Sequence, residues 1–297
     1  MRRLSDEAVT VGEALRLGAT SLPESETPQL DARILLKHVL KADDAGLIAR
    51  ARDPLSTQDC SHYDMLLARR ARSEPIAYIT GVKEFWSLEF NVTPDVLVPR
   101  DDSGALIEAV LARRSRDERL RIADLGTGSG CLLCALLSEF PCSVGVGVDC
   151  SAAALEVARE NASRLGFADR SKFVQGDWLA SLDGVFDIVI ANPPYIPVGD
   201  RAGLARDVSA YEPEGALYAG EDGLDAYRTI IAALPSRLSN DGLLVMECGA
   251  NQTDSLAAML TGIAGDAALF TMADLAGRPR GAGLDRREAP RPGQKKD

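Results

Sequence analysis

The stretch Phe186-Asp187-Ile188-Val189-Ile190-Ala191-Asn192-Pro193-Pro194-Tyr195 sets the expected architecture of the chain. Its apolar part has the length and the β-branched content of a buried strand. The two prolines lack an N–H group and fix φ, so neither a helix nor a strand ladder continues past them. We therefore expect a rigid corner at the carboxyl end of a strand, which is where open α/β sheets bind ligands.

Two acceptor atoms are expected to converge in this corner. The Asn192 side-chain oxygen and the Pro193 carbonyl oxygen would face one point, with Pro194 and the Tyr195 ring beside it. Such an arrangement suits an NH2 group on a flat molecule. The alternative is an ordinary Pro-Pro turn at the end of a strand.

A glycine-rich turn, Asp124-Leu-Gly126-Thr127-Gly128-Ser129-Gly130, follows another strand-like segment and opens a helix. Glycines at this place allow a tight turn and let a ligand approach the backbone. A dinucleotide-binding fingerprint reads G-x-G-x-x-G, and Cys131 occupies the position of its third glycine. A nicotinamide-dependent oxidoreductase therefore fits this turn poorly.

Acidic and aromatic residues at the ends of the next two strand-like segments indicate a nucleoside-like ligand. Asp149 lies 19 residues past Gly130, near the offset of about 20 residues at which an acidic side chain reaches a ribose hydroxyl. Asp177 and Trp178 follow a third segment and are expected to place an acid and an indole against an adenine ring. A buried structural role is the alternative for Trp178.

The residue types present favour a reaction in which the cofactor carries the activated group. The sequence shows no nucleophile–base pair, no P-loop lysine and no metal-binding cluster. Cys131 and Cys134 match a C-x2-C spacing, but no second pair exists, and His38 and His62 are the only histidines. We interpret the two cysteines as buried helix residues. Methyl transfer from a sulfonium requires mainly that the protein align the reacting atoms.

The order of patterns predicts an α/β fold, a Rossmann-like sheet with helices on both faces, preceded by a small helical domain and a β-hairpin connector. The expected divisions are a helical docking domain at 1–75, a hairpin linker at 76–95, a catalytic domain at 96–280 and a disordered tail at 281–297. The hairpin is expected to pair residues 76–79 with 85–92. The polar segment 196–222 is interpreted as a mobile flap beside Asn192. Expected strands are 121–125, 143–149, 172–175, 185–191 and 242–247, and expected helices are 130–139, 152–166 and 223–238.

Composition indicates a reduced, cytoplasmic protein that meets neither a membrane nor a nucleic acid, and we expect a monomer without a composition argument for it. No apolar run approaches the roughly 20 residues needed to span a bilayer, and the N-terminal residues lack the apolar core of an export signal. The six cysteines show no disulfide-scaffold spacing. The formal charge is −11, and residues 91–277 carry 14 basic and 27 acidic side chains. Such a surface repels a phosphate backbone.

With these residues in hand, the chain resembles class I S-adenosylmethionine-dependent methyltransferases, and more narrowly the HemK/PrmC family of release-factor glutamine methyltransferases. The resemblance covers roughly residues 10–280. It rests on the strings Asp31-Ala-Arg-Ile-Leu-Leu36, Glu74-Pro-Ile-Ala-Tyr-Ile-Thr-Gly81, Glu84-Phe-Trp86, Val98-Pro-Arg100, Asp124 to Gly130, Gly176-Asp-Trp178, Asn192-Pro-Pro-Tyr195, Tyr211-Glu-Pro213 and Gly220-Glu-Asp-Gly-Leu-Asp225.

The resemblance implies that S-adenosylmethionine is the cofactor and that peptide-chain release factors are the protein substrate. The acceptor would be the side-chain nitrogen (N5) of the glutamine in their Gly-Gly-Gln loop. Asn192 and Pro193 would accept hydrogen bonds from its NH2 group, and Tyr195 would pack on its plane. The cofactor-binding residues would be Gly126, Thr127, Gly128, Ser129, Gly130, Asp149, Asp177, Trp178 and Asn192, and no metal is expected.

One string departs from the family pattern, which usually continues Val98-Pro-Arg100 with Pro-Glu-Thr-Glu. This chain has Asp101-Asp-Ser-Gly104, which we expect to line part of the cofactor wall. Other functions remain open beside the favoured one: a nucleic-acid N-methyltransferase acting on adenine N6 or guanine N2, the oxidoreductase above, and a non-catalytic protein that only binds the cofactor.

Overall fold

The computed structural model describes residues 9–274 and 276–287. The chain divides into two compact units, each described here by itself. One unit comprises the residues up to Val82 together with Ala205–Tyr211, and the other comprises Lys83–Leu204 and the residues from Glu212 onward.

The helical unit contains α1 (Val11–Thr20), α2 (Pro28–Leu40), α3 (Asp44–Ala49), α4 (Thr57–Arg70), α5 (Ile76–Thr80) and α9 (Arg206–Tyr211). Helix α1 begins with a capping box between Thr10 and Glu13, which satisfies two backbone donors. Tyr63 is fully buried and donates to the Ala32 carbonyl at 2.9 Å. Gly18 makes room for this tyrosine, because a Cβ atom there would lie 2.2 Å from its hydroxyl. The helical fold predicted for the first 75 residues is present.

Helix α9 joins this unit from a distant part of the sequence. The Tyr211 hydroxyl donates to the Arg72 carbonyl at 3.0 Å. The segment interpreted as a flap therefore includes a helix that packs with the N-terminal helices, together with the 3-10 turns η5 (Val198–Gly203) and η6 (Glu214–Ala216). Movement of this segment stays a prediction.

The prediction of a strand at 76–79 was wrong, because these residues form α5. Pro75 precedes the helix and Gly81 ends it in the left-handed conformation, at φ 79°. A short apolar run does not by itself separate a strand from one helical turn. The hairpin pairs β1 (Val82–Phe85) with β2 (Leu88–Asn91) instead.

The second unit is built on a seven-stranded sheet of order β5-β4-β3-β6-β7-β9-β8, in which β9 alone runs antiparallel to the other strands. The strands are β3 (Arg121–Leu125), β4 (Val144–Asp149), β5 (Ser171–Gln175), β6 (Phe186–Ala191), β7 (Leu238–Glu247), β8 (Ala268–Ala273) and β9 (Pro279–Asp285). The helices are α6 (Gly104–Leu111), α7 (Cys131–Glu139), α8 (Ala152–Arg164), α10 (Asp225–Ala233) and α11 (Thr253–Ala264), with the short turns η2 (Asp101–Ser103), η3 (Ala168–Arg170), η4 (Trp178–Ser181) and η7 (Leu234–Ser236). This is the predicted Rossmann-like sheet with helices on both faces.

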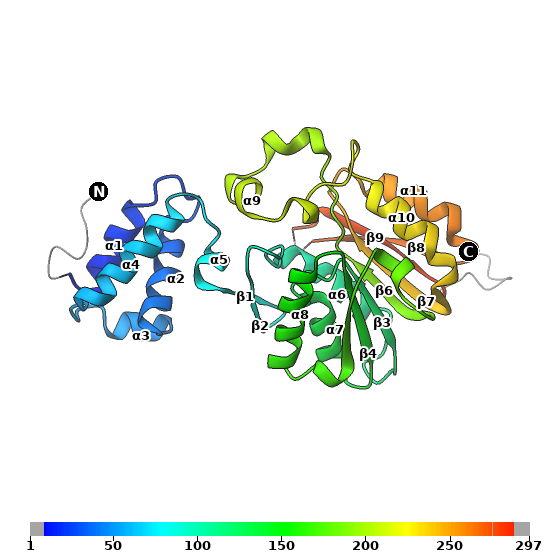
Figure 1. Cartoon of the computed structure of the whole chain (residues 1–297), viewed down its shortest axis with the longest axis horizontal. Helices are drawn as coiled ribbons and strands as arrows, with labels where there is room; N and C mark the ends of the chain where they lie inside the picture. The colour runs from blue at the N-terminus through cyan, green and yellow to red at the C-terminus, as the bar shows by residue number, and fades with distance from the viewer. Residues whose placement is uncertain (1–8, 275, 288–297) are drawn as a thin grey trace, which may run out of the picture. The chain divides into compact units, whose positions relative to one another are not determined.

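Both faces of the sheet are covered (Figure 1). Ile188 and Ile190 of β6 pack on one side with α6, α7 and the hairpin, whereas Val189 and Ala191 pack on the other side with α10 and α11. The alternation follows from the period of two along a strand. Because both faces are buried, β6 reads as a continuous apolar run. Cys134 of α7 is fully buried in the first of these cores, as predicted for a helix cysteine, and Cys131 is partly buried.

The prediction of a disordered tail was wrong for residues up to Asp285, because these residues belong to β9, which pairs with β7 and β8. Arginine, proline and glycine suggested disorder, but the glycines are required by close packing: a Cβ atom at Gly283 would lie 2.4 Å from the Leu244 carbonyl oxygen. Asp285 also pairs with Arg114, both side chains being fully buried. The remainder of the predicted tail, residues 288–297, lies outside the described residues. Helix α11 and strand β8 were not predicted at all.

Candidate functional site

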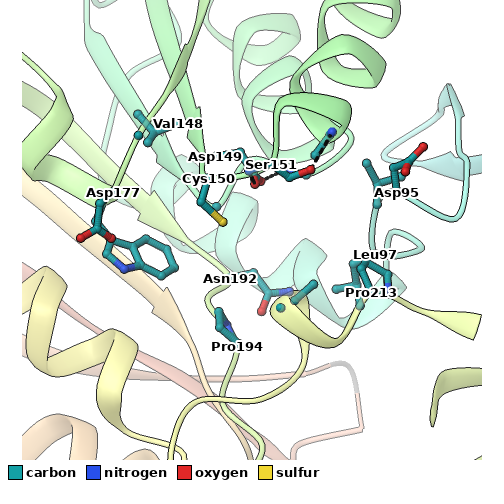
Figure 2. Close-up of a pocket in the computed structure, with 18 residues that line it drawn as sticks. Asp95, Leu97, Val148, Asp149, Cys150, Ser151, Asp177, Asn192, Pro194 and Pro213 are labelled. Carbon is teal, nitrogen blue, oxygen red and sulfur yellow. Dashed lines mark hydrogen bonds between the residues drawn. The ribbon is translucent and has the colours of Figure 1, made fainter. Parts of the chain in front are cut away.

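A pocket lies at the carboxyl ends of four neighbouring strands, β5, β4, β3 and β6 (Figure 2). Each strand contributes the residues that follow it, together with loop residues from two other segments. The pocket is lined by Asp95, Val96, Leu97, Gly126, Gly128, Val148, Asp149, Cys150, Ser151, Ala154, Gly176, Asp177, Trp178, Asn192, Pro194, Pro213, Gly215 and Ala216. The structure thus brings together seven of the residues selected from the sequence: Gly126, Gly128, Asp149, Asp177, Trp178, Asn192 and Pro194.

The glycine turn after β3 lets the pocket reach the backbone. Gly126 and Gly128 both have positive φ, 70° and 52°, a conformation in which glycine carries no steric cost. A Cβ atom at Gly126 would lie 3.2 Å from the Trp178 ring, so the bare backbone also shapes the wall. The turn is held to β4, because the backbone N–H groups of Gly126 and Thr127 donate to the Val148 carbonyl at 2.8 and 2.9 Å.

Asp149 is fixed by backbone donors at the mouth of the turn. One carboxylate oxygen accepts from the Gly128 N–H and the other from the Ser151 N–H, each at 2.9 Å (Figure 2). A carboxylate has about four lone-pair sites, so this half-buried group retains capacity for further donors. A pair of hydroxyl groups on a ribose matches that capacity.

Trp178 lines the pocket in a conformation that is uncommon for a bulky residue. Its φ is 45°, and such strained positions cluster at ligand sites. The indole is half-buried and packs against the core beside α10 while also lining the pocket, and its contact with an adenine ring stays a prediction. The exposed Asp177 precedes it, and the Asp177 N–H donates to Ser181 at 2.7 Å.

Three of the residues predicted to bind the cofactor lie behind the pocket wall rather than on it. The Thr127 hydroxyl donates to Asp124 at 2.7 Å, and Ser129 is buried. Gly130 begins α7, where a Cβ atom would lie 3.3 Å from Ala158. In this turn Gly126 and Gly128 face the pocket, whereas Thr127, Ser129 and Gly130 do not. Burial raises the pKa of Asp124 to about 7.

The corner after β6 presents the Asn192 side chain to the pocket. Its Nδ2 donates to the Ser103 hydroxyl at 3.1 Å. Neither Asn192 Oδ1 nor the Pro193 carbonyl oxygen accepts a hydrogen bond from another residue of the described chain. The Pro193 side chain is buried, whereas Pro194 lines the pocket. The stiff corner therefore places Asn192 on the pocket wall with a side-chain oxygen that has no partner in the described chain, and convergence of the Pro193 carbonyl on the same point stays a prediction.

Tyr195 faces a different hollow. It lines a shallow depression with Ile196, Pro197, Gly199, Asp200, Gly203, Leu204, Gly249, Asn251 and Gln252, not the pocket described above. Its carbonyl oxygen accepts from Gln252 Nε2 at 2.8 Å, which ties the corner to the loop after β7. Burial raises the pKa of its phenol. Its predicted packing on the plane of an acceptor amide stays a prediction.

Sequence reasoning missed the residues that support Asn192 from behind. The string at 101–104 was expected to line the cofactor wall, but none of its residues does. Ser103 instead links Asn192 to Glu247, accepting from the amide and donating to the carboxylate at 2.6 Å. An acidic residue at the end of the buried strand 242–247 was the available signal for Glu247. Nothing in the sequence pairs it with a serine 144 residues away.

Glu247 is an unusual carboxyl group because it is almost completely buried, with 2% of the residue exposed. Burial raises its pKa to about 7, against the lowering effect of the Ser103 hydrogen bond and the Arg280 charge. Within residues 9–274 and 276–287, His, Cys, Asp and Glu side chains form no group that is arranged to hold a metal ion. In the same part of the chain no helix has the length and hydropathy to cross a bilayer.

Comparison with known proteins identifies the family. Residues 13–81 match the PrmC N-terminal domain, and residues 116–258 match a methyltransferase domain. The chain is 43% identical to the release factor glutamine methyltransferase of Bradyrhizobium diazoefficiens and 40% identical to that of Moorella thermoacetica, covering 90% and 91% of this chain and 90% and 95% of theirs. In fold it resembles the hMettl16 catalytic domain, solved with MAT2A 3′UTR hairpin 1, at TM-score 0.54, 15% identity, and coverage of 77% of this chain and 85% of that one. The chain belongs to the family of release factor glutamine methyltransferases.

Proposed function

We propose that this protein transfers a methyl group from S-adenosylmethionine to the side-chain amide nitrogen of the glutamine in the Gly-Gly-Gln motif of peptide-chain release factors. The observation that carries the proposal is the open Asn192 amide oxygen beside the Pro193 carbonyl, in a pocket built from glycine backbone and Asp149. The names of the curated relatives supply the protein substrate.

The pocket fits this cofactor on three counts. Bare glycine backbone at 126 and 128 leaves room where a side chain would intrude. Asp149 retains acceptor capacity for ribose hydroxyls, and Trp178 offers an apolar face for an adenine ring. We propose these residues, with Asp177, as the cofactor contacts; when bound, the cofactor supplies an electrophilic methyl carbon on a sulfonium.

The chain's own part in the reaction is to bind and orient the acceptor. An amide nitrogen is a poor nucleophile because its lone pair is delocalised into the carbonyl. Asn192 Oδ1 and the Pro193 carbonyl would each accept one N–H bond of the glutamine, which raises electron density on the nitrogen and fixes its approach. The nitrogen–carbon bond would form as the carbon–sulfur bond breaks, which turns the sulfonium into a neutral thioether, and the nitrogen would release its extra proton to solvent. Action as a cytoplasmic monomer that does not contact nucleic acid is part of the same proposal.

A labelling experiment tests the proposal. The purified protein is incubated with cofactor carrying a labelled methyl group, and with either release factor or a mixture of RNA and DNA. We expect label in the release factor alone. Label in nucleic acid alone would contradict the proposal and assign the Asn192 corner to a base that is flipped into the pocket. Cofactor binding without transfer to any acceptor would indicate a protein that only binds the cofactor.

A further inference from the structure

Three polar side chains from three separate elements form a row behind the pocket. Asn192 follows β6, Ser103 ends η2, and Glu247 ends β7. The distances are 3.1 Å from Asn192 Nδ2 to Ser103 Oγ and 2.6 Å from Ser103 Oγ to Glu247 Oε2. Ser103 is 3% exposed and Glu247 is 2% exposed, so the hydrogen bond between them is buried, whereas the bond from Asn192 to Ser103 is partly buried. Only the Asn192 end of the row reaches the pocket.

The charge on Glu247 determines the direction of these hydrogen bonds. An ionised carboxylate has no proton, so the Ser103 hydroxyl must donate to it. The serine oxygen is then left as an acceptor toward Asn192, and an acceptor pairs only with the NH2 end of an amide. The oxygen end of Asn192 consequently faces the pocket.

Protonation of Glu247 removes this constraint. A neutral carboxyl group can donate its proton to Ser103 Oγ, which releases the serine hydrogen for Asn192. The serine then pairs equally well with the oxygen end of the amide. A flipped amide presents NH2 to the pocket, where it repels a substrate NH2 group instead of accepting from it.

We propose that Glu247, acting through Ser103, sets which end of the Asn192 amide faces the substrate, so that the carboxylate form presents the acceptor oxygen. Ser103 and Glu247 are positioning residues that act through Asn192. This inference rests on the proposed function, because it assumes that the substrate approaches as an N–H donor.

The surroundings of Glu247 place its titration in the range of ordinary assays. Burial raises its pKa to about 7. Groups facing it come from every element packed around the end of β7, and they are Arg100, Asp102, Tyr195, Tyr227, Cys248 and Arg280. The two arginines lower this pKa and Asp102 raises it. We therefore expect kcat to rise with pH through a midpoint near 7 and then to level off.

Kinetics of matched variants test the role of Ser103. Ser103→Ala should lower kcat by about tenfold or more, the loss expected when one oriented hydrogen bond is removed, with cofactor affinity unchanged. Ser103→Ala should also abolish the rise of kcat with pH, and Glu247→Gln should do the same. Ser103→Thr should keep both the wild-type kcat and its rise with pH, because threonine retains the hydroxyl group. Ser143→Ala is the control: Ser143 is equally buried and hydrogen-bonded to Leu120 and Glu118, but lies at the start of β4, so kcat should not change.

A second measurement does not depend on turnover. In protein labelled with 15N-asparagine, the chain's five asparagines give five side-chain NH2 signals, and the signal lost in Asn192→Ala assigns Asn192. We expect the Asn192 signal to shift with pH, with a midpoint near 7, and to stop shifting in Ser103→Ala. A wild-type protein that shows this shift but methylates no release factor would refute the proposed function while supporting the inference.

Several outcomes would overturn the inference. The first is a kcat in Ser103→Ala equal to that of the wild type. The second is a Ser103→Thr variant that is no more active than Ser103→Ala. An Asn192 signal that does not respond to pH, or that responds equally without the Ser103 hydroxyl, would also contradict it. A loss of unfolding free energy in Ser103→Ala with unchanged kcat would show a merely structural role.

Discussion

Asn192 has two hydrogen-bonding ends, and within residues 9–274 and 276–287 only one of them has a partner. The NH2 end is occupied by Ser103, and the oxygen end is left for a partner from outside the chain. The prolines that follow keep the backbone from rearranging around it. At the scale of single residues, the proposed chemistry therefore depends on one oxygen atom and its orientation.

Replacement of Asn192 is the corresponding prediction. Asn192→Ala should lower kcat by about 10²–10³-fold, the usual cost of one lost hydrogen-bonding group at a reacting centre. Cofactor affinity should change little, because most polar contacts to the cofactor are proposed to come from Gly126, Gly128 and Asp149. Steady-state kinetics and calorimetric titration of the cofactor measure the two effects. Asn240→Ala, on the exposed start of β7, is the control. A normal methylation rate in Asn192→Ala would remove this residue from the mechanism.

Single residues were predictable where their signal is local. Asn192 and Asp149 follow apolar runs, so their place at the carboxyl edge of the sheet could be inferred from neighbours in the sequence. Ser103 and Glu247 could not be connected in this way, because their contact depends on how η2 packs against the end of β7. Thr127 and Ser129 were included only because they lie within the glycine turn, whose geometry turns them away from the pocket.

At the scale of elements, the β1–β2 hairpin stores backbone strain. Trp86 and Ser87, the two turn residues, have φ of 54° and 59°, a conformation that favours glycine and asparagine. Trp86 is anchored by a hydrogen bond to Glu139 at 2.7 Å, whereas Ser87 is exposed. The strain at Ser87 is therefore open to relief without loss of packing.

Ser87→Gly should raise the free energy of unfolding by about 0.5–1 kcal/mol, because glycine adopts positive φ without steric cost. Ser87→Ala serves as the control, since it removes the hydroxyl but keeps the Cβ atom, and it should bring no gain. Urea unfolding monitored by circular dichroism measures both. Equal stability of the two variants would show that this turn carries no strain.

Strand β9 is held in place by a buried ion pair. Arg114 donates to the two carboxylate oxygens of Asp285 at 2.9 and 3.0 Å. Asp285→Ala leaves the guanidinium buried and should cost about 3–5 kcal/mol of unfolding free energy. Glu156→Ala breaks an exposed pair with Arg159 and should cost below about 1 kcal/mol. Urea unfolding measures both losses of unfolding free energy. Similar losses in the two variants would contradict the claim that the Asp285 ion pair holds β9 in place.

The elements that sequence patterns failed to predict share a cause. Strand β9 consists of Pro-Arg-Gly-Ala-Gly-Leu-Asp, which lacks the β-branched residues typical of a strand. It becomes a strand because β7 and β8 pair with it on both sides, and its glycines fit against their backbones. Helix α5 likewise depends on Pro75 and Gly81 at its two ends rather than on the apolar pattern of its own residues. Strands β3 and β6 were predictable because both of their faces are buried, so each contains a nearly continuous apolar run.

At the scale of the whole molecule, two buried carboxyl groups oppose stability at neutral pH. Burial raises the pKa values of Asp124 and Glu247 to about 7, above their values in the unfolded chain. Such a group stabilises the fold while it is protonated, and this contribution is lost as pH rises toward the folded-state pKa. Burial lowers the pKa of His38, so the contribution of His38 to stability increases as pH rises toward 6.5.

Comparison with a variant isolates one of these groups. We expect the stability of the wild type relative to Asp124→Asn to fall by about 1.4 kcal/mol per pH unit between pH 5 and 7, since only the wild type has a group that is ionised in the unfolded chain but protonated in the fold. Asparagine keeps an acceptor for the Thr127 hydroxyl. Urea unfolding at several pH values gives the difference. A difference that is constant with pH would show that Asp124 is not titrating in this range.

The order of a helical domain followed by a parallel sheet could be predicted because the spacing of apolar residues changes along the chain from a helical to a strand period. The inclusion of Ala205–Tyr211 in the helical unit was not, because a six-residue helix gives no signal for the partner on which it packs. The proposed function requires a protein substrate to reach the Asn192 corner.

Mass spectrometry of the Gly-Gly-Gln peptide of a release factor, after exposure to this protein and S-adenosylmethionine, tests the central claim most directly. The account predicts a gain of one methyl group, located by fragmentation on the side-chain nitrogen of the glutamine. An unmodified glutamine under conditions in which the cofactor binds, or a methyl group on any other residue, would contradict it.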